Sequence, residues 1–223
     1  MWCIAPKANA EFVYHMEDVL GVYTRPVDSQ YPVVCMDETN KQLLAEVISP
    51  LAPQPGLPTR FDYEYEHAGV ANLFMFYAPF EGKRRVKVTQ HRTTCDWAEA
   101  MRELAEVDYP DAKKIVVVLD NLNTHSPASF YRAFPPEQAR RLVERFEFHF
   151  TPKHGSWLNM AEIELSAMIR QCLAGRIANE HDLDTQIQAW TVDRNAHAVR
   201  VNWRFTTQDA RIKLKSLYPK YQP

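Results

Sequence analysis

Two acidic residues follow runs of apolar residues at points where a folded chain could bring them together. Asp120 ends the run 115–119, in which four of the five residues are β-branched. Asp37, followed by Glu38, ends a second short apolar run that starts at residue 33. Apolar residues on both faces of such a run predict a central strand of a mostly parallel sheet. Open α/β sheets bind ligands at the carboxyl ends of these strands. A lone Asp after a strand more often only turns the chain, so the hypothesis depends on the repetition.

A third acid, Glu162, lies in a segment that predicts a helix over residues 158–173. Its apolar residues are spaced by seven, four and four positions and form one stripe: Leu158, Leu165, Ile169 and Leu173. Glu162 falls on this stripe, and a carboxylate that a helix turns toward a sheet is costly unless it is paired or binds a metal. Glu164 projects about 200° further round the helix and is the weaker candidate.

Together, Asp37, Asp120 and Glu162 suggest a carboxylate site for a divalent metal ion. Mg²⁺ prefers oxygen ligands, so Asp and Glu without His or Cys are the appropriate donors. Two such ions about 4 Å apart activate an attacking oxygen and stabilise a leaving oxygen in phosphodiester chemistry.

The remaining pattern predicts a mixed sheet, with an antiparallel meander that continues into a parallel half and helices on its faces. The predicted strands cover residues 33–37, 68–77, 84–93, 115–119 and 148–150. The predicted helices cover residues 9–23, 94–107, 136–146, 158–173 and 180–198.

Several basic and aromatic residues are candidates for contacts with nucleic acid. The proline-rich segment 49–58 predicts an irregular loop, either a simple connector, which we favour, or a substrate-facing loop with Arg60 as a phosphate contact. Arg85 and Lys87 share one side of a strand, where they would follow a phosphate backbone or, as the simpler interpretation, protect a solvated sheet edge. The turn-rich loop 151–157 contributes Lys153 and Trp157, the one tryptophan that we do not assign to the core.

Composition narrows the class of protein. The 223 residues carry a net charge of −2 and have 46% hydrophobic content, which is typical of a globular chain without an overall basic character. Only six glycines occur, and neither G-x-G-x-x-G nor a P-loop motif is present. The four cysteines lack metal-site spacing and predict reduced core cysteines in a cytosolic protein. The sequence contains no pattern of a signal peptide or a membrane span.

Three blocks of this sequence resemble the catalytic blocks of bacterial insertion-sequence transposases related to the mariner group. The blocks are MDET around Asp37, VVVLDNLNTH around Asp120 and HGSWLNMAEIELS around Glu162. The resemblance extends through YEYEHAGVANLFMFYAP and NWRFTTQDARIKLKSLYP and so covers nearly the whole chain. The ordered set is specific, although any one block alone would be a weak signal.

The resemblance implies a D-D-E endonuclease with a ribonuclease-H-like fold, in which Asp37, Asp120 and Glu162 bind two Mg²⁺ or Mn²⁺ ions. Asn121 and His125 match the family's D-N-x-x-x-H pattern and would orient the site, with Asn159 of the third block as a further supporting residue. Met160 and Ala161 stand where the family often has Pro-Ile. The implied domains are a helical lead-in (1–30), the catalytic domain (31–178) and a helical extension packed on it (179–223).

The implied function is cleavage of DNA at element ends and transfer of the cut strand to target DNA, in the bacterial cytoplasm at the nucleoid. Such transposases usually begin with helix-turn-helix segments, whereas none of the 32 residues before Val33 reads as a basic recognition helix. We therefore expect a catalytic half with weak, salt-sensitive DNA binding, acting as a homodimer or with full-length transposase. The alternatives are a ribonuclease-H-like nuclease without transposition and an inactive remnant that binds full-length transposase.

Overall fold

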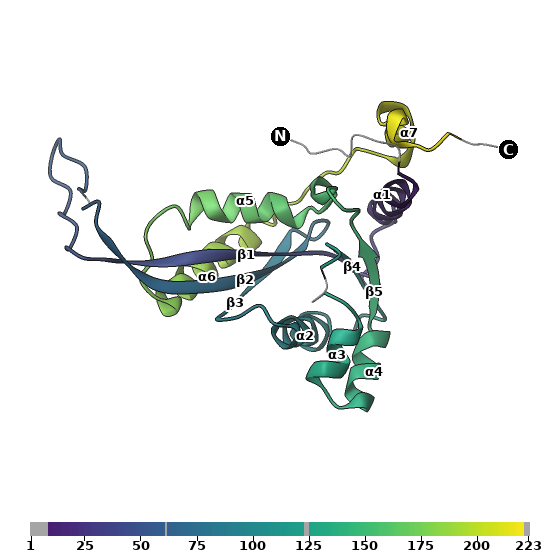
Figure 1. Ribbon diagram of the computed structural model, residues 1–223, viewed down its shortest axis with the longest axis horizontal. Coiled ribbons are helices and arrows are strands. Elements are labelled where there is room, and N and C mark those ends of the chain that lie inside the picture. The colour runs from purple at the N-terminus through teal and green to yellow at the C-terminus, as the bar shows by residue number, and fades with distance from the viewer. Residues whose placement is uncertain (1–8, 61, 123–124, 221–223) are drawn as a thin grey trace.

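The computed structural model describes residues 9–60, 62–122 and 125–220, and within them a mixed five-stranded sheet forms the centre of the fold (Figure 1). The strands are β1 (Val33–Glu46), β2 (Tyr65–Ala78), β3 (Lys83–Thr89), β4 (Ile115–Leu119) and β5 (Phe146–Phe150). Their order across the sheet is β3-β2-β1-β4-β5. β1, β2 and β3 are antiparallel neighbours, whereas β4 and β5 run parallel to β1. The predicted meander with a parallel half is confirmed.

Helices cover both faces of the sheet, as predicted (Figure 1). One face carries α1 (Ala10–Tyr23), α5 (Ala161–Gln171), α6 (Glu180–Ala196) and α7 (Thr207–Lys213), with short 3₁₀ turns at Ser156–Leu158 and Lys215–Leu217. The other face carries α2 (Thr94–Glu103), α3 (Ala128–Ala133) and α4 (Pro136–Glu144). A π-helical turn, Leu104–Asp108, continues α2.

Each face of the sheet has its own apolar core because successive side chains of a strand point to opposite faces. In β1, Cys35 and Leu43 join the core beneath α1, α5 and α6, whereas Val34 and Met36 join the core beneath α2 and α4. The first core also contains residues of α7, so the segments predicted as lead-in and extension share their apolar contacts with the sheet.

β1 is much longer than the predicted strand 33–37, so the prediction that this strand ends at Asp37 is wrong. Its antiparallel pairing with β2 continues to Glu46 opposite Tyr65, with a register shift at Leu43/Leu44. Residues 65–70 of β2 are exposed, and this far part of the hairpin extends beyond the body of the protein (Figure 1). The polar residues 37–41, which interrupt the apolar pattern of β1, pair with the buried residues 71–75 of β2. The proline-rich segment joins the two strands, with isolated bridges between Leu51 and Arg60 and between Gln54 and Leu57.

Other boundaries also differ from the predictions. β3 ends at Thr89 because Thr93, which was assigned to that strand, caps α2 in a reciprocal capping box with Asp96. Phe146, predicted as the end of a helix, starts β5 instead. The short helix α3 was not predicted.

Core predictions for cysteine and tryptophan are confirmed only in part. The three described cysteines are free thiols, and Cys35 is buried and Cys172 half-buried, but Cys95 is exposed, so its assignment to the core is wrong. Trp97 and Trp190 are buried. In the part of the chain that the structure describes, no helix is long and apolar enough to cross a membrane.

Candidate active site

Asp37 and Asp120 stand at the same level of two parallel strands. Val33 lies opposite Val116 and Cys35 opposite Val118, a constant difference of 83 residues (116 minus 33). The same difference separates Asp37 from Asp120, which directly follows the last residue of β4. Asp37 is therefore not at the end of its own strand but just past the end of its parallel pairing with β4.

Asn159 positions Glu162, the third acid, near Asp37. Its buried side chain donates a hydrogen bond from Nδ2 to the carbonyl oxygen of Met36 at 2.8 Å and accepts one at Oδ1 from the amide of Ala161 at 3.1 Å. The start of α5 is thus bonded to β1 one residue before Asp37. Glu162 lies in the first turn of α5, on the face of the sheet toward which the side chain of Asp37 alternates.

The three carboxylates interact electrostatically. The pKa of Asp37 is raised to about 7, chiefly by burial and, to a smaller extent, by the negative charges of Asp120 and Glu162. The amide of Glu38, which donates to Oδ1 of Asp37 at 2.8 Å, acts in the opposite direction. A cation placed among these groups would offset the burial and the repulsion that together raise the pKa of Asp37.

The donor set fits a hard divalent cation, because all three side chains offer carboxylate oxygens. Among the described residues, however, no three His, Cys, Asp or Glu side chains are placed so that they surround an ion. The chemistry of a metal site is therefore present in Asp37, Asp120 and Glu162, and their side chains would have to close around the ion.

His125 connects Asp120 to a fourth acid, Glu38. Its Nδ1 lies 2.7 Å from Oδ1 of Asp120, and its Nε2 lies 3.3 Å from Oε2 of Glu38. The buried ring stacks on Trp97, with centroids 5.7 Å apart and planes inclined by 22°. Burial lowers the pKa of His125, but the two carboxylates outweigh it and raise the pKa to about 9. His125 is therefore a cation at neutral pH and donates to both acids.

The sequence reasoning assigned no role to Glu38. This side chain is nearly buried and also binds Arg92, with Nη1 of Arg92 2.9 Å from Oε1. Strand periodicity could have separated Glu38 from Asp37, since neighbouring residues of a strand point to opposite faces. Asp37 faces α5, whereas Glu38 faces the side of Trp97 and α2.

The buried acid of α5 is Glu164, not Glu162, so the predicted ranking of their burial is wrong. Glu164 is 1% exposed; its Oε2 lies 2.9 Å from Nε of Arg84, and both of its oxygens accept hydrogen bonds from Arg194. The predicted apolar stripe is also wrong at Ile169, which is 45% exposed. The helix spans only Ala161–Gln171, so two of the four stripe residues lie outside it and the assumed helical spacing does not apply.

A hollow of about 610 Å³ reaches the site from the surface. Asp120, Asn121 and Lys153 contribute to its lining, together with residues at the start of α1. Trp157 is half-buried and packs edge-on against Phe205, with centroids 5.9 Å apart.

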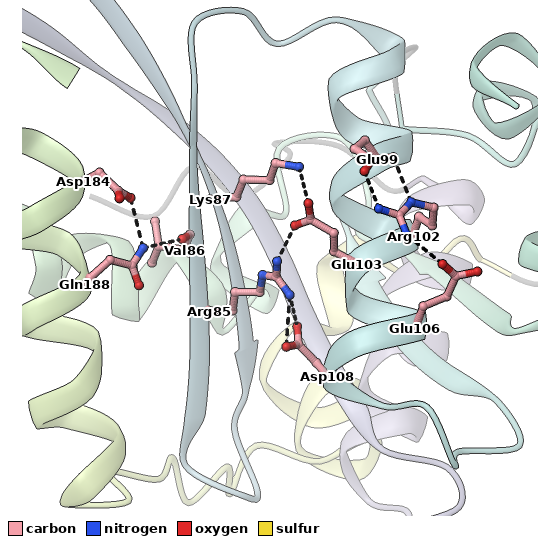
Figure 2. Close-up of polar contacts among 10 residues, drawn as sticks. All are labelled: Arg85, Val86, Lys87, Glu99, Arg102, Glu103, Glu106, Asp108, Asp184 and Gln188. Carbon is pink, nitrogen blue, oxygen red and sulfur yellow. Dashed lines mark hydrogen bonds and ion pairs between the residues drawn. The ribbon is translucent and has the colours of Figure 1, made fainter. Parts of the chain in front are cut away.

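The structure does not bring the other predicted DNA contacts into this hollow. Arg60 is exposed on the segment between β1 and β2. Arg85 and Lys87 of β3 both bind Glu103 of α2, and Arg85 also binds Asp108 (Figure 2).

Comparison with protein families gives a match over residues 32–184 to the model of the DDE superfamily endonucleases. The chain belongs to this superfamily. The matched range includes Asp37, Asp120 and Glu162. Comparison with curated protein sequences finds no match.

The DDE chain also has the fold of the Mos1 mariner transposase. It matches the crystal structure of the Mos1 catalytic domain with a TM-score of 0.59 at 10% identity, covering 99% of this chain and 100% of that one. It matches the Mos1 strand transfer complex with a TM-score of 0.60 at 11% identity, covering 100% of this chain and 66% of that one. It matches the mariner Mos1 paired-end complex with Mg with a TM-score of 0.57 at 13% identity, covering 99% of this chain and 66% of that one. The chain therefore spans about two thirds of the longer Mos1 chain. The ribonuclease-H-like fold is confirmed.

Proposed function

We propose that this chain is the catalytic part of a transposase that cleaves DNA at element ends and joins the cut strand to target DNA. The observation that carries the proposal is the meeting of three family carboxylates, from β1, from the end of β4 and from the first turn of α5. The similar Mos1 structures include a strand transfer complex, which supports joining as well as cutting.

Asp37, Asp120 and Glu162 would hold one or two Mg²⁺ or Mn²⁺ ions. When bound, such ions supply Lewis-acid stabilisation of the attacking and leaving oxygens of a phosphodiester. His125 would bind one carboxylate oxygen of Asp120 and orient the group, so that the other oxygen is free to bind the ion. Asn159 would hold α5, and with it Glu162, against β1.

DNA would enter through the hollow that ends at Asp120. Lys153 offers a cation and Asn121 a polar side chain on its walls, so we propose that these two contact the phosphate backbone. Arg60 and Trp157 stay as predicted contacts outside this lining. Arg85 and Lys87 would first have to leave Glu103 and Asp108, and we give them less weight.

Element ends and target DNA are the proposed partners, with a second copy of this chain or a full-length transposase holding the paired ends. Support comes from the Mos1 paired-end complex with left transposon end, which this chain resembles in fold at 13% identity. The corresponding location is the bacterial cytoplasm at the nucleoid.

The test is nicking of supercoiled plasmid DNA by the purified chain in Mg²⁺ or Mn²⁺, without metal, and with the variants Asp120→Ala and Glu162→Gln. We expect metal-dependent nicking that both variants lose. Joining is tested with a pre-cut oligonucleotide that has a free 3′ hydroxyl, which should become linked to the plasmid.

Glu137→Gln is the matched control, because Glu137 is exposed on α4 outside the site. Nicking without joining would favour a ribonuclease-H-like nuclease. A folded parent that neither nicks nor binds Mn²⁺ would sink the proposal and favour a remnant.

A further inference from the structure

The outer edge of β3 is available for a further strand. β3 is the outermost strand of the described sheet and pairs with β2 on its inner side. The side chain of Asn195 imitates a neighbouring strand at Arg84: it accepts from the Arg84 amide at 2.9 Å and donates to the Arg84 carbonyl oxygen at 2.8 Å. Alternate residues present their backbone groups to the same edge, so Val86 and Val88 also face outward.

Only part of this edge is occupied by helix side chains. Gln188 of α6 donates from Nε2 to the carbonyl oxygen of Val86 at 3.3 Å. By the same alternation, the amide of Val86 and both backbone groups of Val88 remain on the edge. Such groups are what an extended peptide binds when it adds a strand to a sheet.

A hollow of about 700 Å³ follows this edge beside α6. Residues 84–88 line its floor, and Asp184, Gln188 and Thr191 of α6 line one wall. In Figure 2, Val86 lies beside Gln188 of α6, whereas Arg85 and Lys87 extend toward Glu103 of α2. Because Asn195 already occupies both backbone groups of Arg84, the stretch from Val86 to Val88 is the part of the floor with which an added strand would pair.

The charged residues that line this hollow, called the groove below, determine which kind of peptide segment it can bind. The cations of the floor already have acidic partners: Arg85 binds Glu103 and Asp108, Lys87 binds Glu103, and Arg84 shares Glu164 with Arg194. On the α6 wall, Glu180 and Asp184 have no ion-pair partner among the described residues. The uncompensated charge of the groove is therefore negative, which opposes DNA and favours lysine or arginine.

A smaller hollow with a partly apolar lining adjoins the groove at Arg84, Arg85 and Asp108. Its volume is about 320 Å³, and its apolar lining comes from Phe76, Leu104 and Val107, among others. Val107, in the π-helical turn after α2, is 64% exposed. An apolar side chain at the end of an added strand would find its contact here.

We propose that the outer edge of β3 binds an extended, lysine- or arginine-bearing segment of a partner protein as a sixth strand. Basic side chains on one face of the segment meet Glu180 and Asp184, and its backbone pairs with Val86 and Val88. A second copy pairing symmetrically through β3 is disfavoured, because it would bring its own Glu180 and Asp184 to the same interface.

The test uses an eight-residue peptide of alternating lysine and threonine, acetylated and amidated, titrated into the ¹⁵N-labelled chain. We expect shifts of the Val86 and Val88 amide signals and slower hydrogen exchange of both. Two further peptides carry backbone N-methyl groups, either on every lysine or on every threonine. Only alternate residues of an added strand bond the edge, so one of these peptides should bind and the other should not.

The charge contribution is tested with Glu180→Gln/Asp184→Asn, which should weaken peptide binding roughly tenfold at low salt. The matched control, Glu137→Gln/Asp193→Asn, makes the same charge change at two exposed positions outside the groove and should leave binding unchanged. Four results would overturn the proposal: unchanged amides at millimolar peptide, equal binding of a glutamate–threonine peptide, a DNA duplex that displaces the peptide, or a dimer that forms through β3.

Discussion

Nδ1 of His125 lies 2.7 Å from Oδ1 of Asp120, and the other ring nitrogen of the same histidine lies 3.3 Å from Glu38. The histidine thus holds the Asp120 carboxylate in place from the opposite side of the sheet to α5. We predict that His125→Ala lowers metal-dependent nicking at least tenfold, because Asp120 loses its orienting donor. It also destabilises the fold by about 1–3 kcal/mol, since Glu38 loses one of its partners.

Nicking rates and urea unfolding of His125→Ala, beside His197→Ala, check this prediction. His197 is exposed at the end of α6, so its loss should leave both quantities unchanged. Full activity of folded His125→Ala would contradict the positioning role.

In the absence of metal, we expect the Asp37 side chain to lower the free energy of unfolding. Its pKa is about 7 in the folded chain, above the 3.8 of an unperturbed Asp, so the folded state retains a proton there that the unfolded state has lost. Stability contributed by this group therefore falls as the pH rises from about 4 to 7. We predict that Asp37→Asn stabilises the metal-free protein by about 1–3 kcal/mol at pH 8.

Thermal unfolding between pH 4 and pH 8, with and without Mg²⁺, is the measurement. Mg²⁺ should raise the Tm of the parent but not that of Asp37→Asn. A variant less stable than the parent at pH 8 would show that the buried charge of Asp37 is not a net cost to stability.

Asn159 makes two buried hydrogen bonds that join the first turn of α5 to β1. Replacement by alanine leaves the carbonyl oxygen of Met36 and the amide of Ala161 without these partners, at a cost of about 1–3 kcal/mol. We also predict weaker Mn²⁺ binding, measured by calorimetry, because Glu162 loses its fixed distance from Asp37. Asn202→Ala, at an exposed position, is the control. Unchanged metal affinity in a folded Asn159→Ala protein would rule out the positioning role.

The Glu164 carboxylate forms ion pairs with Arg84 and Arg194 in the core between β3, α5 and α6. Glu164→Ala leaves Arg84 and Arg194 without their shared carboxylate, and we predict a loss of about 3–5 kcal/mol in the free energy of unfolding. Denaturant unfolding measures it, with Glu137→Ala on the exposed surface as the control. A loss below about 1 kcal/mol would mean that the arginines find other partners.

Glu17 binds Arg211 and Tyr218 and so ties α1 to the C-terminal segment. The Arg211 guanidinium, as the main cause, lowers the pKa of Glu17 below its usual value. A lowered carboxyl pKa contributes stability above about pH 4.5 that is lost as the pH falls through the folded pKa. Glu17→Gln should therefore cost under about 1 kcal/mol at pH 7, because Arg211 is exposed and solvent screens the pair, and less at pH 3. Equal costs at both pH values in thermal unfolding would contradict this assignment.

The sequence by itself determined the sheet and its family. The apolar run before Asp120 predicted β4 with its observed bounds, and the spacing of strands and helices predicted the mixed, two-sided sheet. Three ordered acidic blocks indicated the carboxylates that the family match includes. The sheet follows from residue type and local periodicity, which a single chain displays directly, whereas the family followed from the resemblance of the three blocks to known sequences.

Tertiary structure decided what each polar side chain contacts. Asp37 and Glu38 are neighbours in sequence, yet β1 directs one toward α5 and the other toward His125. Glu164 is buried because arginines from β3 and α6 reach it, and neither arginine is near it in sequence. Burial of a charge depends on partners supplied by distant elements, so local spacing could not distinguish Glu164 from Glu162.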